Sequence, residues 1–423
     1  MLWAAFCFPR KQKAAQVYHG TILLMPRTFH TGVSRRPHKR EFWPVYSTVL
    51  LLILHTFFVA YINSSFLEQF IPDTAVGLIY TVGSAVSVLI FLFISRVLHR
   101  VGNYNLTVWL LVLNFAAVIG MSQAESLRVA VPLFIVHLIA VPMIVFNLDV
   151  FMEELIGNEE GDTGKRRGLL LTLGSFIGAM APFISSLVVD FGDGSFEFAY
   201  IISALVLIPI VFILFKYFRN FNDPPYKEIQ LFSAMRTFWV HRNVRWVFLT
   251  HFILQIFFMF MVVYAPLYLV GHNGMSWREF GVVMFFAQLA YVIFEYPAGI
   301  IADKYIGEKE MMAAGFLILA VASSWMSFVN TGDVALWIII MFVLRIGASL
   351  SEVTTESYFF KQINGSDAQI ISFFRVTRPL AYVIGAMLGS LTLLYLPFNL
   401  LFTVLGLLMV PAMFFAAQIK DTK

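Results

Sequence analysis

The chain has few charged residues for its size. Only 13% of its 423 residues are charged, whereas an ordinary soluble domain has about 25%. Hydrophobic residues make up 59% of the chain, and phenylalanine alone contributes 45 residues. A soluble protein of this length could not keep so much apolar surface away from water. The composition therefore argues against a soluble globular protein and favours one that lies in a lipid bilayer.

Several chemical motifs are also missing. Cys7 is the single cysteine, which excludes a disulfide framework and a metal site built from thiolates. No His/Glu cluster has the spacing of metal ligands, and no glycine-rich loop of the kind that binds ATP phosphates is present. We therefore expect no enzyme activity, no cofactor or metal, no direct use of ATP and no nucleic-acid partner.

Twelve apolar runs account for most of the chain. Each is about 20 residues long, the length that a helix needs to cross about 30 Å of hydrocarbon. The runs are continuous rather than alternating, which favours helices over the strands of a membrane β-barrel. The sequence thus predicts an all-α integral membrane protein with twelve transmembrane helices. The predicted spans are residues 43–65, 74–95, 105–122, 129–152, 168–189, 196–218, 244–269, 279–300, 311–329, 333–354, 368–393 and 397–418.

Basic residues are unevenly distributed between the loops that these spans would leave. The loops after odd-numbered spans contain Arg128 and Arg278 as their only bases, whereas the other loops and both termini contain nearly all the remaining Lys and Arg. Because cytoplasmic loops are enriched in Lys and Arg, we expect both termini in the cytoplasm and the protein in the inner or plasma membrane. The basic, acid-free first 40 residues fit a transit peptide or a cytoplasmic tail, and we interpret them as a tail.

A polar stretch and a weak internal repeat divide the chain into two halves. Asp223-Pro224-Pro225 opens the stretch, and a shift of 207 positions places Asp149 on Glu356 without a gap. Related six-helix halves are typical of transporters whose substrate site lies between them near the bilayer midplane. The predicted segments are a basic tail 1–42, a six-helix bundle 43–218, a connector 219–243, a second bundle 244–419 and a tail 420–423.

One predicted cytoplasmic loop carries a specific motif. Gly299-x-x-x-Asp303-Lys304-x-x-Gly307-x-Lys309 resembles the signature loop of the major facilitator superfamily, G-x-x-x-D-R/K-x-G-R/K-R/K. The corresponding loop of the first half is residues 95–104, where Arg100 and Gly102 fit the motif but His99 stands where the family has Asp. The resemblance implies a twelve-helix transporter in two pseudo-symmetric bundles.

The resemblance also implies that this loop latches the two bundles together on the cytoplasmic side. Asp303 would cap the next helix, whose dipole favours an anion, or pair with a base across the interface. A turn residue that is merely solvated is the alternative. The predicted cytoplasmic gate comprises Gly299, Asp303, Lys304, Gly307, Asp149, Glu356, Arg166, Arg167, Arg375, Arg378, Arg100 and Gly102.

Ionisable residues at membrane depth are the candidates for substrate and proton binding, because such residues usually face a partner or a cavity. In the tenth span Arg345, Ser349, Glu352 and Glu356 follow one helical stripe. Arg345 lies about 18 Å from the outer end of this span, near the midplane. Arg345, Glu352, Glu295 and His55 are therefore our candidates for substrate and proton coupling, and a structural ion pair of Arg345 with Glu352 or Glu295 is the alternative.

The sequence leads to one functional prediction and two alternatives. We predict a secondary active transporter that moves a small solute by alternating access, with proton coupling because carboxylates and a histidine lie at membrane depth. We expect it to act as a monomer. A transporter-like scaffold or sensor without flux is the alternative from another class. Efflux of lipophilic compounds is the alternative within transport, although Gly178-x-x-x-Pro182 departs from the Gly-Pro pattern of drug antiporters in this family.

Overall fold

The computed structural model describes residues 43–156, 163–224, 242–362 and 368–420, and every element in this part of the chain is helical. The elements of the first half are α1 (Trp43–Ala60), α2 (Asn63–Glu68), α3 (Asp73–Val101), α4 (Asn103–Ser122), α5 (Leu127–Ile156), α6 (Thr163–Phe191), α7 (Glu197–Leu205) and α8 (Leu207–Tyr217). Those of the second half are α10 (Arg242–Pro266), η2 (Leu267–His272), α11 (Trp277–Ile301), η3 (Ala302–Ile306), α12 (Glu308–Met326), α13 (Val334–Gln362), α14 (Ala368–Tyr395) and α15 (Leu400–Ala417).

The described helices include twelve spans that are long and apolar enough to cross a membrane, as the sequence predicts. Each contains an 18-residue window with high mean hydropathy and at most two charged residues. Many of their large apolar side chains stay exposed, among them Trp109, Phe212 and Leu407, which are 70%, 65% and 63% exposed. Surface of this kind is stable against lipid rather than water, so the chain is a multi-pass membrane protein.

Two predicted spans are interrupted rather than continuous. The run 196–218 forms α7 and α8, which meet at Val206. Pro209 explains the break, because its nitrogen has no hydrogen to donate to the carbonyl of Leu205, four residues earlier. The first predicted span, 43–65, likewise ends at Ala60, and a short helix, α2, begins at Asn63.

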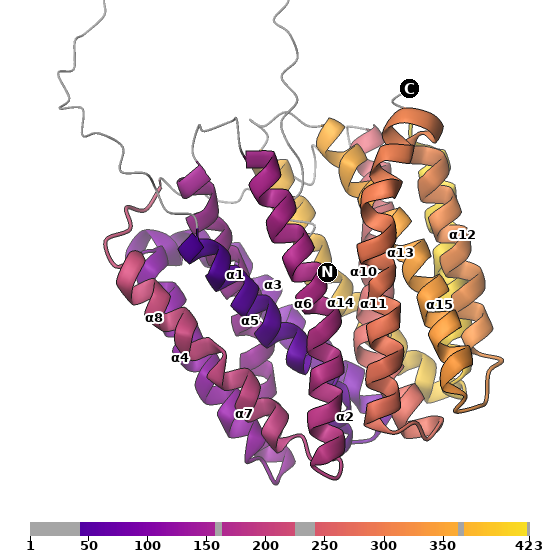
Figure 1. The fold of residues 1–423 in the computed structure, drawn as a ribbon, viewed down its shortest axis with the longest axis horizontal. Coiled ribbons are helices and arrows are strands. Elements are labelled where there is room, and N and C mark those ends of the chain that lie inside the picture. The colour runs from indigo at the N-terminus through magenta and orange to yellow at the C-terminus, as the bar shows by residue number, and fades with distance from the viewer. Residues whose placement is uncertain (1–42, 157–162, 225–241, 363–367, 421–423) are drawn as a thin grey trace, which may run out of the picture.

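The helices form two groups that lie side by side in Figure 1, with α1 to α8 in one group and most of α10 to α15 in the other. Helix α3 packs against α14, and α6 packs against α11. Helix α10 and η2 are buried almost throughout residues 250–269, so this segment lies inside the bundle. These contacts bring helices from the two halves of the sequence together along one interface.

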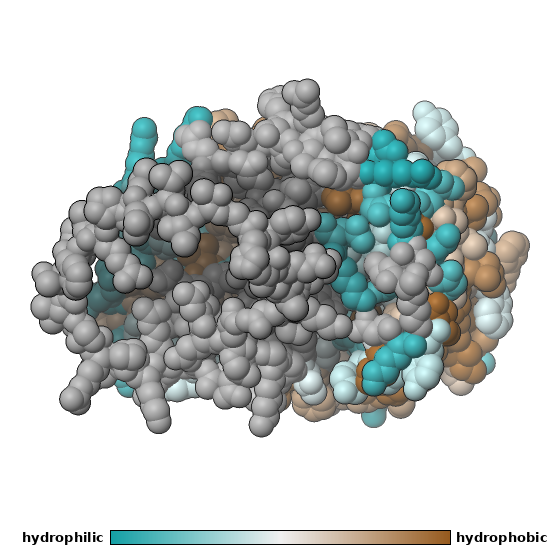
Figure 2. All heavy atoms as spheres, turned by 90° about the horizontal axis from the view of Figure 1, so that it is seen from above, coloured by the Kyte–Doolittle hydropathy of each residue, from teal (hydrophilic) through white to brown (hydrophobic). Residues whose placement is uncertain are grey.

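The two ends of the bundle differ in charge. The end at which α1 starts and α15 stops, here called the basic end, carries Arg96, Arg100, Lys216, Arg219 and Lys304. Figure 2 looks onto this end, where hydrophilic residues gather over the helices of the second half and hydrophobic residues form the outer edge. The opposite, acidic end carries Glu68, Asp73, Asp190, Glu197 and Glu279.

Candidate functional site

Arg345 lies at the middle of the membrane-spanning region. It is the twelfth residue of α13, about 17 Å from the acidic end of that helix, and its side chain is fully buried. Its Nη2 donates a hydrogen bond of 3.1 Å to the Tyr61 hydroxyl, and Gln288 Nε2 donates one of 3.2 Å to the same oxygen. Tyr61 follows α1, so this contact joins the two halves of the sequence.

The rest of the guanidinium has few partners. It lies over the ring of Tyr291, 5.9 Å from the ring centroid, a distance at which a cation is attracted to the aromatic face. Its Nε and Nη1 atoms are buried without a hydrogen-bond acceptor, and so is the Ser349 hydroxyl one turn along α13. We call Tyr61, Gln288, Tyr291, Arg345 and Ser349 the arginine cluster.

Two carboxylates lie between the arginine cluster and the basic end. Glu352 is 7% exposed on α13, two turns from Arg345, and Glu295 is half-buried on α11. The charges of the two carboxylates interact with each other, and Tyr291 interacts with both Glu352 and Arg345. Within the described residues neither carboxylate forms an ion pair with Arg345. The structure therefore lacks the ion pair that was one alternative for these residues.

His55 lies in a different environment, inside the first group of helices. Its Nδ1 is 2.9 Å from the carbonyl oxygen of Ser203, and its Nε2 is 2.9 Å from Asn114 Nδ2. The Asn114 Oδ1 is in turn 2.8 Å from His137 Nδ1. We call His55, Asn114, His137 and Ser203 the histidine cluster, and all four residues are buried.

The hydrogen bonds of the histidine cluster fit one direction throughout. Asn114 must donate through Nδ2, so His55 Nε2 accepts and its Nδ1 donates to the Ser203 carbonyl. His137 Nδ1 then donates to Asn114 Oδ1. The ring of His55 is thereby assigned as neutral from its partners. Both ring nitrogens of His55 on α1 are used in contacts with Asn114 on α4 and Ser203 on α7. His55 therefore has no ring nitrogen in contact with the arginine cluster.

The two predicted signature loops adopt the same backbone turn. Gly102 has φ 81° and ψ 153°, and Gly307 has φ 110° and ψ 154°. Positive φ is costly for residues with a Cβ, so glycine is needed at both turns. Each glycine directly precedes a helix, α4 or α12. The two loops thus share one turn conformation at the start of α4 and of α12.

The first-half loop obtains its acid from a distant part of the chain. Asp223 Oδ1 accepts a hydrogen bond of 2.8 Å from the backbone nitrogen of Asn103, the first residue of α4. A Cβ on Gly102 would lie only 2.8 Å from Asp223 Oδ2. A carboxylate at this helix start is favourable because of the free N–H groups and the helix dipole. Asp223 thus provides a carboxylate beside a loop that has His99 at the family's Asp position.

Some of the predicted gate residues are described and others are not. Lys304 and Arg100 are exposed at the basic end, whereas Asp149 and Glu356 are 6% and 3% exposed. Arg378 is half-buried on α14 and interacts with Tyr382. The side chains of Asp303, Arg166, Arg167 and Arg375 lie outside the described residues.

Gly299 does not need to be glycine for close packing, since an added Cβ would lie 3.5 Å from Val353 Cγ1, an ordinary contact. The residue after the loop is more tightly held. Glu308, the first residue of α12, is 1% exposed and forms an ion pair with Lys361 near the end of α13. This ion pair fixes the start of α12 to α13 at the basic end.

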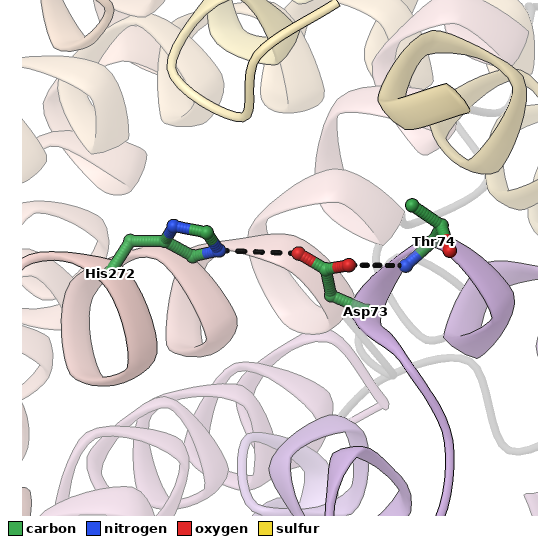
Figure 3. A network of polar contacts seen from close by, with 3 residues as sticks. All are labelled: Asp73, Thr74 and His272. Carbon is green, nitrogen blue, oxygen red and sulfur yellow. Dashed lines mark hydrogen bonds and ion pairs between the residues drawn. The ribbon is translucent and has the colours of Figure 1, made fainter. Parts of the chain in front are cut away.

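At the acidic end the two halves meet through polar contacts. His272 Nε2 lies 3.2 Å from Asp73 Oδ2, and Asp73 Oδ1 accepts a hydrogen bond of 2.7 Å from the backbone nitrogen of Thr74, as Figure 3 shows. Asp73 begins α3 and His272 ends η2. Burial and the negative charge of Asp73 raise the pKa of the nearby Glu68 carboxyl, while His272 acts in the opposite sense.

Close packing extends this contact towards the middle of the membrane. A Cβ on Gly77 of α3 would lie 2.1 Å from the Tyr264 hydroxyl and 2.5 Å from the carbonyl of Ala386. On the other side of the interface, a Cβ on Gly281 of α11 would lie 2.7 Å from Ser186 Cβ. Only glycine fits at either position without displacing its neighbours. Glycine at these two positions therefore lets the two halves approach closely near the acidic end.

Sequence reasoning missed several residues of the site. Gln288 and Tyr291 precede Glu295 by seven and four positions on α11, a spacing that places all three on one helix face. That spacing was visible in the sequence and could have identified them. Nothing in the sequence indicates that Tyr61, which lies between α1 and α2, contacts Arg345.

These features define a class of protein: a polytopic membrane protein with two helical groups and a buried arginine between them at mid-membrane depth. The profile of the Major Facilitator Superfamily matches residues 159–355 and 247–421. The chain belongs to this superfamily, and the members of the family are transporters rather than enzymes.

Two known proteins illustrate the relationship. The chain is 26% identical over 199 residues to a protein described as the multidrug efflux pump SdrM of Staphylococcus aureus (strain N315), and the match covers 46% of this chain and 40% of that protein. Its fold is similar to that of a mutant of the nucleoside transporter NupG, with a TM-score of 0.72 and 11% identity over 89% of this chain and 99% of that chain. The second similarity supports the fold alone.

Proposed function

We propose that this protein is a secondary active transporter that moves a small solute by alternating access through a site built on the arginine cluster. The observation that carries the proposal is Arg345, a fully buried cation at mid-membrane depth with unused hydrogen-bond donors. A buried charge without a partner is costly, and such residues in membrane proteins mark pathways for ions or substrates. Tyr61 ties this site to the other half of the protein, as a site between two moving bundles requires.

Proton coupling is supported by Glu295 and Glu352. The two carboxylates interact with each other in a mostly buried region next to the arginine cluster. Two nearby negative charges repel each other in a medium of low dielectric constant. A shared proton would remove this repulsion, and its loss would restore it. Protonation can therefore bias the packing of α11 against α13 and couple proton movement to the solute site.

Alternating access is supported by the position of the contacts between the halves. These run from His272 and Asp73 at the acidic end to Tyr61 and Arg345. We assign this conformation to a state closed at the acidic end. The excess of Lys and Arg at the basic end favours a cytoplasmic location for that end and for both termini. The signature loop with Asp303, Arg166 and Arg167 is proposed as the gate on that side.

Efflux of lipophilic compounds is the second candidate, because the matched relative is described as a multidrug efflux pump. The match covers 40% of that protein. A permanently charged arginine buried at the site favours a polar solute instead. The direction and the chemical class of the transported solute separate the two candidates.

Proton and solute fluxes in proteoliposomes test the proposal. A dye in the vesicle lumen would report solute-driven proton movement for a panel of organic anions, sugars, nucleosides, amino acids and lipophilic cations. We expect at least one polar solute to drive proton movement, and Glu352→Gln to abolish the coupling. Glu125→Gln, which neutralises an exposed acid, is the matched control. A protein that moves neither protons nor any solute would contradict the proposal and favour a sensor or scaffold.

Cysteine labelling tests the orientation. After replacement of Cys7, probes placed at residues 192–195 and 271–275 should react with an impermeant reagent from outside sealed cells, and probes at 305–308 should not. Labelling of 305–308 from outside would overturn both the orientation and the cytoplasmic gate.

A further inference from the structure

We propose that the arginine cluster binds the carboxylate group of a small, hydroxylated monovalent organic anion. This inference rests on the proposed function and specifies its substrate class. It starts from the hydrogen bonds of Arg345. A guanidinium has five N–H donors in a fixed plane. The structure gives it one hydrogen bond of good geometry, from Nη2 to Tyr61, and a less well aligned contact with the Tyr291 hydroxyl. Nε and Nη1 have no well-aligned acceptor in a fully buried side chain.

The free donors are arranged for a planar anion. Each outer edge of a guanidinium pairs Nη2 with either Nε or Nη1. Nη2 has two hydrogens, and Tyr61 accepts one of them. Whichever hydrogen that is, one edge keeps both of its N–H groups. Two parallel N–H donors match the two oxygens of a carboxylate, and such bidentate contacts are stronger and more specific than single ones.

The protein does not supply this anion from the described residues. Glu352 is two helical turns from Arg345, about 10 Å along α13, and neither Glu352 nor Glu295 forms an ion pair with it. Arginine cannot relieve its burial by losing a proton, since it stays charged in proteins. An external anion would neutralise the site.

The surroundings favour a single negative charge. Tyr291 interacts with both Arg345 and Glu352, so the two carboxylates of the coupling pair are close enough to affect a bound solute. A dianion such as a phosphate monoester would place a second negative charge near them. Such like-charge proximity is unfavourable in a medium of low dielectric constant. A carboxylate, with one charge, balances Arg345 without this cost.

Two hydroxyl groups, one at the guanidinium and one a helical turn along α13, favour a hydroxylated solute. The Ser349 hydroxyl, one turn from Arg345, is buried without a partner, and the Tyr291 hydroxyl contacts the guanidinium but is buried without a well-aligned hydrogen bond. Buried hydroxyls without partners are unfavourable. A solute with hydroxyl groups next to its carboxylate would satisfy both, so hydroxycarboxylates of the lactate and gluconate type fit the cluster best.

Binding measurements on the purified protein test the inference. We would compare lactate with lactamide, a neutral analogue of nearly the same shape in which an NH₂ donor replaces one carboxylate oxygen, and gluconate with glycerol and glycerol 3-phosphate. Thermal stabilisation and calorimetry would report binding. We expect saturable binding of lactate or gluconate and at least tenfold weaker binding of lactamide. Arg345→Lys keeps the positive charge but loses the two parallel N–H donors, so it should weaken binding at least tenfold. Arg278→Lys at an exposed position should not weaken binding.

Each other outcome has a clear meaning. Equal binding of lactate and lactamide, or stronger binding of glycerol 3-phosphate than of either hydroxycarboxylate, would overturn the inference. The comparison of lactate with lactamide uses the unmodified protein, so it does not depend on the folding of a variant. Proton-coupled flux of a neutral or cationic solute without carboxylate binding would overturn the inference and keep the proposed function. Specific carboxylate binding without any flux would keep the inference and overturn the proposed function.

Discussion

The histidine cluster and the arginine cluster differ in how completely their polar groups are hydrogen-bonded. In the histidine cluster, His55, Asn114 and His137 form a chain in which each donor has an acceptor, ending at the Ser203 carbonyl. In the arginine cluster, the Nε and Nη1 atoms of Arg345 and the Ser349 hydroxyl have none. Both clusters are buried at membrane depth, and burial alone does not distinguish them.

The difference separates structural polar groups from functional ones. A network whose members satisfy one another stabilises the packing of its helices and has no donor left for a solute. A network with unused donors is stabilised only when something else binds. Whether a titratable residue at membrane depth has a structural or a functional role is thus better judged from its unused donors and acceptors than from its residue type.

The largest effect is expected for Arg345→Gln. The loss of two charge-assisted hydrogen bonds, each worth about 1.5–3 kcal/mol, corresponds to a decrease in transport of about 100-fold or more. Stability should change little, because no described carboxylate loses an ion-pair partner. Flux per inserted molecule and the melting temperature would be measured together. A large decrease in the melting temperature of Arg345→Gln would indicate a structural role instead.

The opposite pattern is expected for Asn114→Leu. This change leaves His55 Nε2 and His137 Nδ1 without partners, which should lower the free energy of unfolding by about 2–4 kcal/mol. Transport per folded molecule should stay within about twofold, because the arginine cluster is untouched. Asn105→Ala, at an exposed position on the same helix, is the control for stability. Loss of flux in folded Asn114→Leu protein would show that the histidine cluster takes part in transport.

A smaller effect is expected for Tyr61→Phe. Arg345 and Gln288 each lose their hydrogen bond to the Tyr61 hydroxyl, but the free edge of the guanidinium remains. We expect solute affinity to change by about 3- to 10-fold, since one hydrogen bond to a charged group is lost. Titration of solute binding to this variant checks the prediction. A complete loss of binding would mean that Tyr61 itself contacts the solute.

The smallest effect concerns pH at the acidic end. The pKa of Glu68 is raised from its ordinary value of 4.5 in this closed state. Its protonated form therefore favours closure: the stabilisation is fully present below about pH 4.5 and is lost as the pH rises through the raised pKa. Acidification should close this end, and Glu68→Gln should remove that dependence. The pH dependence of closure is measured as the distance between labels placed on either side of the Asp73–His272 contact, from about pH 4 to about pH 8. A pH profile of Glu68→Gln equal to that of the unmodified protein would contradict the role of Glu68.

Much of the fold could be predicted because each span must satisfy a simple length and composition rule. The stripe of Arg345, Ser349 and Glu352 on α13 also follows from helical periodicity, and these residues are all buried there. The break at Val206 was missed, although Pro209 signals it. A local sequence rule predicts these features because the interactions lie within one helix.

The partners of the buried polar groups could not be predicted in the same way. His55 and Arg345 are both ionisable residues at membrane depth, and the sequence of their own spans does not show which of them has partners. Their difference arises from Ser203 and Asn114 in one case and Tyr61 in the other, residues that are distant in sequence. Such contacts depend on how whole helices pack, and no local pattern specifies them.

Hydroxycarboxylate-driven proton movement in proteoliposomes, compared between Arg345→Gln and Asn114→Leu and normalised to folded protein, tests the central claim most directly. If the arginine cluster is the solute site and the histidine cluster is structural, Arg345→Gln will abolish the signal and Asn114→Leu will keep it within about twofold. Retained proton movement in Arg345→Gln together with its loss in Asn114→Leu would contradict the claim and place the coupling site in the first group of helices.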